Sequence, residues 1–130
     1  MRIRREIYGM ARIGWVPYGS EKTVEVYVNT DDAGQVPHFH VRKYGRRHRF
    51  DWEVCVMYES CNYFAHGRYS GTIPDRNIIK QLDKMLRQQN PIRPGRTFWQ
   101  TAIEDWNANN SERMLPYDLE QPDYTKLNVR

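Results

Sequence analysis

The sequence has 130 residues and a mass of 15.7 kDa, which fits one compact domain and leaves no room for two sizeable cores. Hydrophobic residues make up 39% of it and the mean hydropathy is −0.88, but an aromatic share of 13% supplies bulky side chains for a core, so wholesale disorder is excluded. No apolar run approaches the roughly 20 residues that cross a bilayer, and no apolar stretch follows the basic start. We therefore expect a cytoplasmic protein without a membrane segment.

Charge is unevenly distributed along the chain. The formal net charge of +4 arises from 20 basic and 16 acidic side chains. Residues 1–50 hold ten basic and five acidic side chains, whereas residues 101–130 hold three and six. This asymmetry suits binding to an acidic partner, and it equally suits neutralisation of the basic half by the acidic tail, within one molecule or across a homodimer. Both interpretations stay open.

The two cysteines, Cys55 and Cys61, are too few for a disulfide scaffold and do not have the Cys-x-x-Cys spacing of a zinc or redox motif. Their separation in sequence would fit opposite arms of a hairpin, but a cytoplasmic compartment disfavours a bridge. We expect two free thiols.

The first two thirds of the chain predict strands. Val24, Val26 and Val28 alternate with polar residues, a pattern typical of a half-buried strand. Similar short runs, bounded by polar turns, predict four more strands. The five expected strands cover residues 10–16, 22–30, 38–43, 52–59 and 63–66. The connections are short, which favours an antiparallel meander.

Two helices are expected in the last third. The first lies near residues 74–89, because a capping Thr72, the early proline Pro74 and the acidic Asp75 precede apolar residues at helical spacing. It ends before Pro91.

The second helix lies near residues 98–109 and opens on Thr97 and Gln100, which form a capping-box pattern. Trp99 and Trp106 share its apolar stripe. Aromatic side chains at this spacing pack in a core more often than they bind a ligand.

Together these elements predict an α+β domain, an antiparallel sheet of about five short strands with two C-terminal helices packed on one face. We expect this domain to span residues 1–110. Residues 111–130 combine prolines, tyrosines and acids without a clear period, which indicates an extended or mobile C-terminal arm.

A histidine pair stands out in the expected third strand. Because side chains alternate along a strand, Phe39 and Val41 point into the core. His38, His40 and Arg42 then form a row on the other face, about 7 Å between neighbours. Two imidazoles beside a guanidinium are the strongest candidate for chemistry in this chain.

Three interpretations of this row stay open. The imidazoles can share a divalent ion with His66, His48 or Asp51, but a His-x-His pair alone falls short of the usual three or four ligands, so we expect no metal site. They can act as acid and base on a phosphodiester, with Arg42, Arg46 or Arg47 stabilising the charged transition state. They can also hydrogen bond to neighbouring loops and brace the sheet.

The turn after this strand is strongly basic. Residues 42–49 contain five cations and no acid, with two aromatic rings between them. We expect this turn to contact an acidic protein surface or a protein–nucleic-acid complex, although cations at a hairpin tip are often only solvated. The candidate partner-binding residues are Arg42, Lys43, Arg46, Arg47 and Arg49.

Three segments resemble a known family. They are Pro37-His-Phe-His-Val41, Tyr63-Phe-Ala-His66 and Trp106-Asn-Ala-Asn-Asn110. The chain resembles, over about residues 10–110, small bacterial proteins classed as a domain of unknown function, which typically show a Pro-Pro-His-x-His-Val segment. The most similar branch occurs in bacterial and mobile-element genomes.

This resemblance implies a role without stating an activity. Small members often sit in gene pairs that look like toxin–antitoxin cassettes, which implies regulation or inhibition, and a mobile-element origin implies inhibition of host defence. The sequence departs from the pattern at Val36, which replaces the first proline, in the basic insert 44–49 and in the longer chain after Asn110.

We therefore expect a small non-enzymatic interaction protein, without a cofactor, that binds and regulates or inhibits another macromolecule. The charge asymmetry, the basic turn and the many aromatic side chains favour this, and no phosphate-binding loop, nucleophile elbow or zinc-protease signature occurs. The alternative is a metal-independent ribonuclease of toxin type, with His38 and His40 as acid and base and Arg42 with Arg47 at the phosphate.

Overall fold

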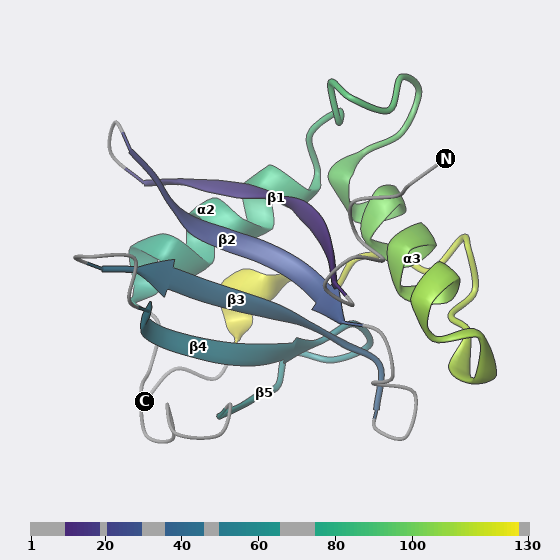
Figure 1. The fold of residues 1–130 in the computed structure, drawn as a ribbon, viewed down its shortest axis with the longest axis horizontal. Coiled ribbons are helices and arrows are strands. Elements are labelled where there is room, and N and C mark those ends of the chain that lie inside the picture. Colours follow the sequence, from purple (N-terminus) through teal and green to yellow (C-terminus); the bar gives the residue numbers. More distant parts are fainter. Residues whose placement is uncertain (1–9, 19–20, 30–35, 46–49, 66–74, 128–130) are drawn as a thin grey trace.

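Five strands form one antiparallel sheet in the order β1-β2-β3-β4-β5, so each strand pairs with the next one in the chain (Figure 1). The computed structural model describes residues 10–18, 21–29, 36–45, 50–65 and 75–127. The strands are β1 (Met10–Tyr18), β2 (Glu21–Asn29), β3 (His38–Tyr44), β4 (Phe50–Met57) and β5 (Tyr63–Ala65). The expected meander is confirmed.

Two helices follow the sheet, which confirms the α+β class. They are α2 (Arg76–Leu86), which lies behind the sheet in Figure 1, and α3 (Phe98–Asn109), which lies beside it. Two short 3-10 turns, η3 (Ser111–Arg113) and η4 (Tyr124–Lys126), complete the described elements. Among the described residues no helix is both long and apolar enough to cross a membrane.

Both helices begin just after a residue whose side chain caps the first turn, but the cap of α2 differs from the predicted one. Asp75 caps α2 by accepting a hydrogen bond from the backbone nitrogen of Ile78 at 2.9 Å, so the helix begins at Arg76. Thr72, the predicted cap, lies outside the described residues. An acidic side chain just before the apolar period satisfies the first-turn amides directly, which explains the later start.

At α3 the predicted capping box is confirmed. The hydroxyl of Thr97 accepts from the backbone nitrogen of Gln100 at 3.1 Å, and the Gln100 side chain accepts from the backbone nitrogen of Thr97 at 2.8 Å.

One hydrophobic core lies between the sheet and both helices. Phe39 and Val41 of β3 belong to it, as the strand alternation predicts. Trp99 is 6% exposed and Trp106 is fully buried, which confirms that the tryptophan stripe of α3 packs in the core. The helices therefore cover the face of the sheet that carries the valines.

The C-terminal arm packs against the same core. Leu115, Tyr124 and Leu127 are buried there. The indole nitrogens of Trp99 and Trp106 donate to backbone carbonyls of the arm, at 2.7 Å to residue 119 and 2.8 Å to residue 113. The described part of the C-terminal arm therefore packs on the domain, and side chains of α3 hydrogen bond to its backbone.

Candidate functional site

The face of the sheet opposite its valines is polar and, at its centre, buried. His38, His40 and Arg42 lie on this face, as predicted from the alternation. His38 is only 1% exposed and His40 only 2%, so they do not form the surface row that the sequence suggests. The strand alternation therefore predicts correctly on which face of the sheet the two histidines lie, but it does not predict that they are buried there.

A layer of polar side chains continues across three strands. We call the following residues the polar layer: Glu25, Tyr27, His38, His40, Arg42, Glu53 and Cys55. Tyr27, His40 and Cys55 are direct cross-strand partners on β2, β3 and β4, and Glu25, Arg42 and Glu53 form the neighbouring row. Every member except Arg42 is buried.

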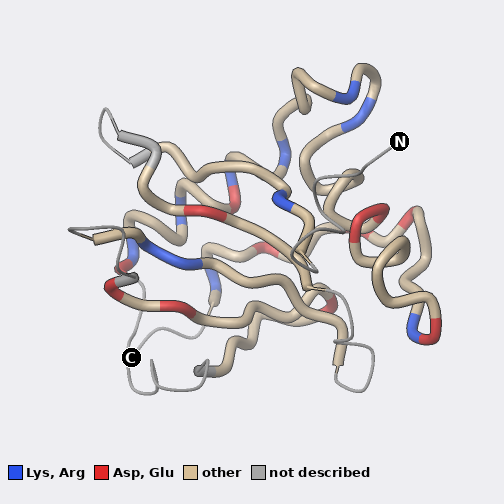
Figure 2. Tube along the Cα trace, viewed as in Figure 1, with Lys and Arg blue, Asp and Glu red and all other residues tan. Residues whose placement is uncertain are grey.

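Glu25 organises the first part of the layer. Its carboxylate, fully buried, accepts hydrogen bonds from Arg12, from Arg42 at 2.8 Å and from the Tyr44 hydroxyl at 3.0 Å. The Arg42 guanidinium also lies 4.2 Å from the centre of the Tyr27 ring. In Figure 2 the basic stretch of β3 accordingly lies between acidic stretches of β2 and β4.

The prediction that Arg42 belongs to the partner-binding turn is wrong, because its guanidinium pairs with Glu25 of the polar layer. Its ion pair with Glu25 at 2.8 Å holds Arg42 against the sheet, because the fully buried carboxylate of Glu25 needs a charged partner. Lys43 forms an ion pair with Asp51 across the hairpin at 2.9 Å. Arg46, Arg47 and Arg49, like His48 and His66, lie outside the described residues.

Glu53 organises the second part. Its carboxylate accepts from the Tyr27 hydroxyl and from Nδ1 of His40, the latter at 2.9 Å. Burial, and then the hydrogen bond to Glu53, raise the pKa of the Tyr27 hydroxyl. Tyr27 therefore remains a neutral donor to this carboxylate, which offsets the cost of burying the charge.

Cys55 lies close to both histidines. Its Sγ is 3.6 Å from Nδ1 of His40, and the two imidazole rings are 5.0 Å apart. Burial alone would raise the pKa of the thiol, but hydrogen bonds from His38 and His40 outweigh it, so the pKa of Cys55 is lowered. One potential ligand atom from each of these three residues lies within 4.8 Å of the other two.

Sequence reasoning identified the histidines and Arg42 but missed Glu25, Glu53 and Cys55. Glu25 and Glu53 look like solvent-facing residues of amphipathic strands, and Cys55 looks like an ordinary free thiol. Both cysteines are indeed free. The signal that links Cys55 to His40 is the pairing of β3 with β4, which places these two residues opposite one another.

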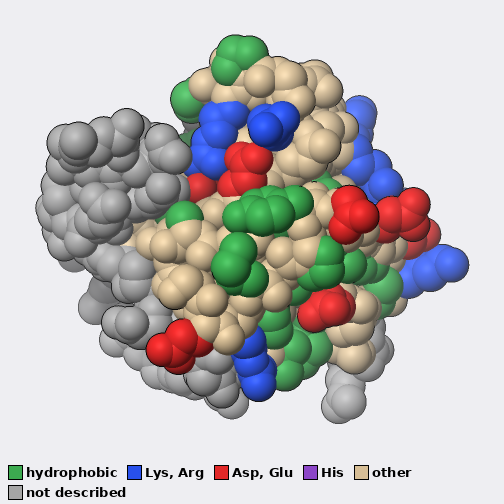
Figure 3. Space-filling view, turned by 90° about the vertical axis from the view of Figure 1, so that its right-hand side faces the viewer, with side chains coloured by type: hydrophobic (Ala, Val, Ile, Leu, Met, Phe, Trp, Pro, Cys, Tyr) green, Lys and Arg blue, Asp and Glu red, His purple; other side chains and the backbone are tan. Residues whose placement is uncertain are grey.

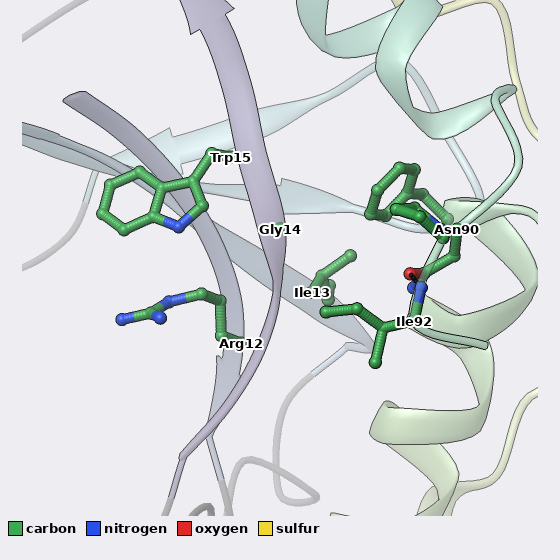
Figure 4. A pocket seen from close by; sticks show the side chains of 8 residues that line it. Arg12, Ile13, Gly14, Trp15, Asn90 and Ile92 are labelled. Carbon is green, nitrogen blue, oxygen red and sulfur yellow. Dashed lines mark hydrogen bonds between the residues drawn. The ribbon is translucent and has the colours of Figure 1, made fainter. Parts of the chain in front are cut away.

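A second feature is an open groove of about 560 Å³ along β1. Four consecutive residues of β1 form one wall, and the connection between α2 and α3 forms the other. The lining residues are Arg12, Ile13, Gly14, Trp15, Asn90, Pro91, Ile92 and Phe98. In Figure 4, Arg12 and Trp15 lie on one side of the strand, and Ile13 and Ile92 lie on the other.

Gly14 allows the helical layer to approach β1 this closely. A Cβ at this position would lie 2.7 Å from the Met85 methyl and 3.0 Å from the Phe98 ring. The groove is therefore narrow at its floor and open at its rim, where the Ile92 side chain is 78% exposed.

The face of the molecule that carries α3 mixes charges of both signs (Figure 3). Arg96 pairs with Glu104 at 2.8 Å, and Arg93 pairs with the buried Asp105 at 2.8 Å. These cations hold the α2–α3 connection against α3, so they act within the fold.

Comparisons with protein-family models, curated proteins and solved structures found no match. The family resemblance therefore stays a prediction from the motifs.

Proposed function

We propose that the protein is a non-enzymatic interaction protein of the cytoplasm, which regulates or inhibits a partner protein by binding a short extended segment in the groove along β1. The observation that supports this is the open groove beside the edge of the sheet. The segment that fits it best is acidic and carries one apolar side chain.

The backbone of β1 offers the first part of such a contact. β1 is an edge strand, and within the described part of the chain it pairs with β2 alone. An edge strand presents backbone donors and acceptors to an added strand, and extended peptides bind many proteins in this way. The register shifts within β1, between Arg12 and Gly14 and between Val16 and Tyr18, limit this pairing to a few residues.

The side chains around the groove offer the second part. Ile13, Ile92 and Phe98 provide an apolar hollow for one partner side chain. Arg12 is 49% exposed at the same groove, where its guanidinium lies 4.9 Å from the Trp15 ring centre. Glu25 pairs with both Arg12 and Arg42, so one net positive charge remains there, on the side of β1 opposite Ile13 (Figure 4). Because neighbouring residues of an added strand point to opposite faces, this charge favours a segment with an acidic residue next to an apolar one.

The basic turn is the second proposed contact with an acidic partner. Arg42 belongs to the polar layer, so the contact depends on the other four cations of the turn, led by Arg46, Arg47 and Arg49. A partner segment in the groove and an acidic surface at the turn are compatible, and separate variants distinguish them.

The experiment is selection of short peptides from a random displayed library on the full chain, followed by affinity measurement by calorimetry. We expect enriched peptides to combine Asp or Glu with one large apolar residue. Ile92→Asp should weaken their binding at least about tenfold, because it places a charge in the hollow. Met114→Asp is the matched control, since Met114 is an exposed apolar residue, 53% accessible, outside the groove.

Three outcomes contradict the proposal. If wild type and Ile92→Asp bind every selected peptide with equal affinity, the groove is not the binding site. If the triple variant Arg46→Glu, Arg47→Glu, Arg49→Glu loses binding and Ile92→Asp does not, the partner binds the basic turn and not the groove. RNA cleavage in the presence of EDTA that disappears in His38→Ala and in His40→Ala, but not in His48→Ala, establishes the ribonuclease instead.

A further inference from the structure

We infer that His38, His40 and Cys55 form a binding site for a thiophilic divalent metal ion, of which zinc is the ion the donor set suits best. This goes beyond the proposed partner binding and does not depend on it. Two imidazoles and one thiolate are donors found in zinc sites, and three protein ligands with a fourth position left for another group are a common arrangement.

The sheet itself fixes the positions of the three residues. His38 and His40 are alternate residues of β3, so their side chains emerge from the same face. Cys55 is the direct cross-strand partner of His40 on β4. Three ligands on two paired strands are held by backbone hydrogen bonds rather than by a loop, which lowers the cost of organising the site.

One separation matches that of a tetrahedral site, and the other two lie within 4.8 Å. With a metal–sulfur distance of about 2.3 Å and a metal–nitrogen distance of about 2.05 Å, a tetrahedral angle places sulfur and nitrogen about 3.6 Å apart. The observed distance from Cys55 Sγ to His40 Nδ1 is 3.6 Å. All three pairs of ligand atoms lie within 4.8 Å, so the widest pair has to close by at most about 1.5 Å.

The hydrogen bond of His38 to the backbone selects a tautomer that a metal can use. Its Nδ1 lies 2.8 Å from the backbone oxygen of Val36, and because a carbonyl only accepts, Nδ1 carries the hydrogen. The Nε2 atom of the neutral ring then carries the lone pair that can bind a metal. A backbone carbonyl that orients the second ring nitrogen is the usual outer partner of a metal-bound histidine.

Glu53 supplies the charge balance. It is 2% exposed and lies 2.9 Å from Nδ1 of His40. When that nitrogen binds the metal, the hydrogen of the neutral ring moves to Nε2, which lies 3.4 Å from the side-chain amide of Asn29, and that amide can turn its oxygen toward it as acceptor. The Glu53 carboxylate keeps its hydrogen bond from Tyr27 and remains beside His40. A divalent cation, one thiolate and one carboxylate sum to zero, so the occupied site buries no net charge.

The test is titration of the reduced full chain with Co²⁺, followed by displacement with Zn²⁺. Cobalt in a tetrahedral site gives intense visible bands, and a cysteine ligand adds a thiolate-to-cobalt charge-transfer band in the near ultraviolet. The chain has two cysteines. Cys61→Ser leaves Cys55 as its one thiol, so the charge-transfer band in this variant must come from Cys55.

We expect one equivalent of Co²⁺ to bind wild type and Cys61→Ser with the same spectrum, and Zn²⁺ to bleach it. Cys55→Ser should lose the charge-transfer band. His38→Ala, His40→Ala and Cys55→Ser should each weaken Zn²⁺ binding more than about 100-fold, whereas Glu53→Gln should weaken it about 10- to 100-fold. His48→Ala is the control histidine.

Absence of the charge-transfer band in folded Cys61→Ser overturns the site, and this result does not require any variant of the buried ligands to fold. The same holds if a folded Cys55→Ser retains the band. Affinity reduced by His48→Ala and unchanged in a folded His38→Ala would show a surface histidine site and would also contradict the proposal.

Discussion

At the scale of single residues, Asn107 explains how a segment without any periodic pattern is fixed to the domain. Its side-chain amide donates to the backbone oxygen of Leu115 at 2.9 Å and accepts from the backbone nitrogen of Leu115 at 2.7 Å. Asn110, the last residue of the same motif, donates to the backbone oxygen of Asn29 at 3.0 Å. The asparagines after Trp106 thus connect α3 to the arm and to β2.

Replacing Asn107 with Ala should lower the free energy of unfolding by about 2–4 kcal/mol, because both buried backbone groups of Leu115 lose their partner. Urea unfolding followed by circular dichroism measures the change. Asn109→Ala is the matched control, since that side chain makes one hydrogen bond, to the backbone oxygen of Asp105, and should cost less than about 1 kcal/mol. Equal midpoints for both variants would contradict this role of Asn107.

At the scale of elements, the sequence predicted what depends on local spacing. The alternation in β3 separates Phe39 and Val41 from His38 and His40, and the capping box of α3 begins where it should. These features depend on neighbours within one element, so a single segment contains the whole signal.

Contacts between two elements could not be predicted from the spacing of residues within one segment. The pairing of His40 with Cys55 depends on the register of β3 against β4, and a register shift between Lys43 and Tyr44 alters that register near the turn. The burial of Glu25 and Glu53 was missed because the polar face of an antiparallel sheet ordinarily meets water. The candidate metal ligands therefore emerge only when the strands are assembled.

The start of α2 provides a test at this scale. Asp75→Ala should destabilise the protein by about 1 kcal/mol, because the amide of Ile78 loses its acceptor, whereas Thr72→Ala should change stability by less than half as much. Thermal unfolding of the two variants, side by side with wild type, measures the difference. The reverse order of effects would place the cap at Thr72, as the sequence pattern alone suggests.

At the scale of the whole molecule, one sheet separates an apolar core from a buried polar layer, and tyrosines are buried on both sides. Tyr58 donates to the backbone oxygen of Ala102 at 2.7 Å, and Tyr124 donates to that of Met57 at 2.9 Å. Tyr27 donates to Glu53 in the polar layer. Burial is the main cause that raises the pKa of each of these three hydroxyls above the ordinary value of 10.0.

Stability should consequently fall steeply on the alkaline side. A hydroxyl whose pKa is raised in the folded state contributes stability that is complete below pH 10, the value for the unfolded chain, and is lost as the pH rises toward its folded pKa. Each of the three tyrosines then costs about 1.4 kcal/mol at pH 11, or about 4 kcal/mol together, which is a large part of the stability of a small domain. Urea midpoints between pH 8 and 12, with phenolate absorbance recorded in parallel, measure this loss.

Tyr58→Phe should reduce the dependence of stability on alkaline pH by about a third. Tyr117→Phe is the control, because the Tyr117 side chain is 61% exposed and its loss removes one tyrosine without changing the core. A slope that is the same in wild type and Tyr58→Phe would show that Tyr58 ionises without unfolding the protein.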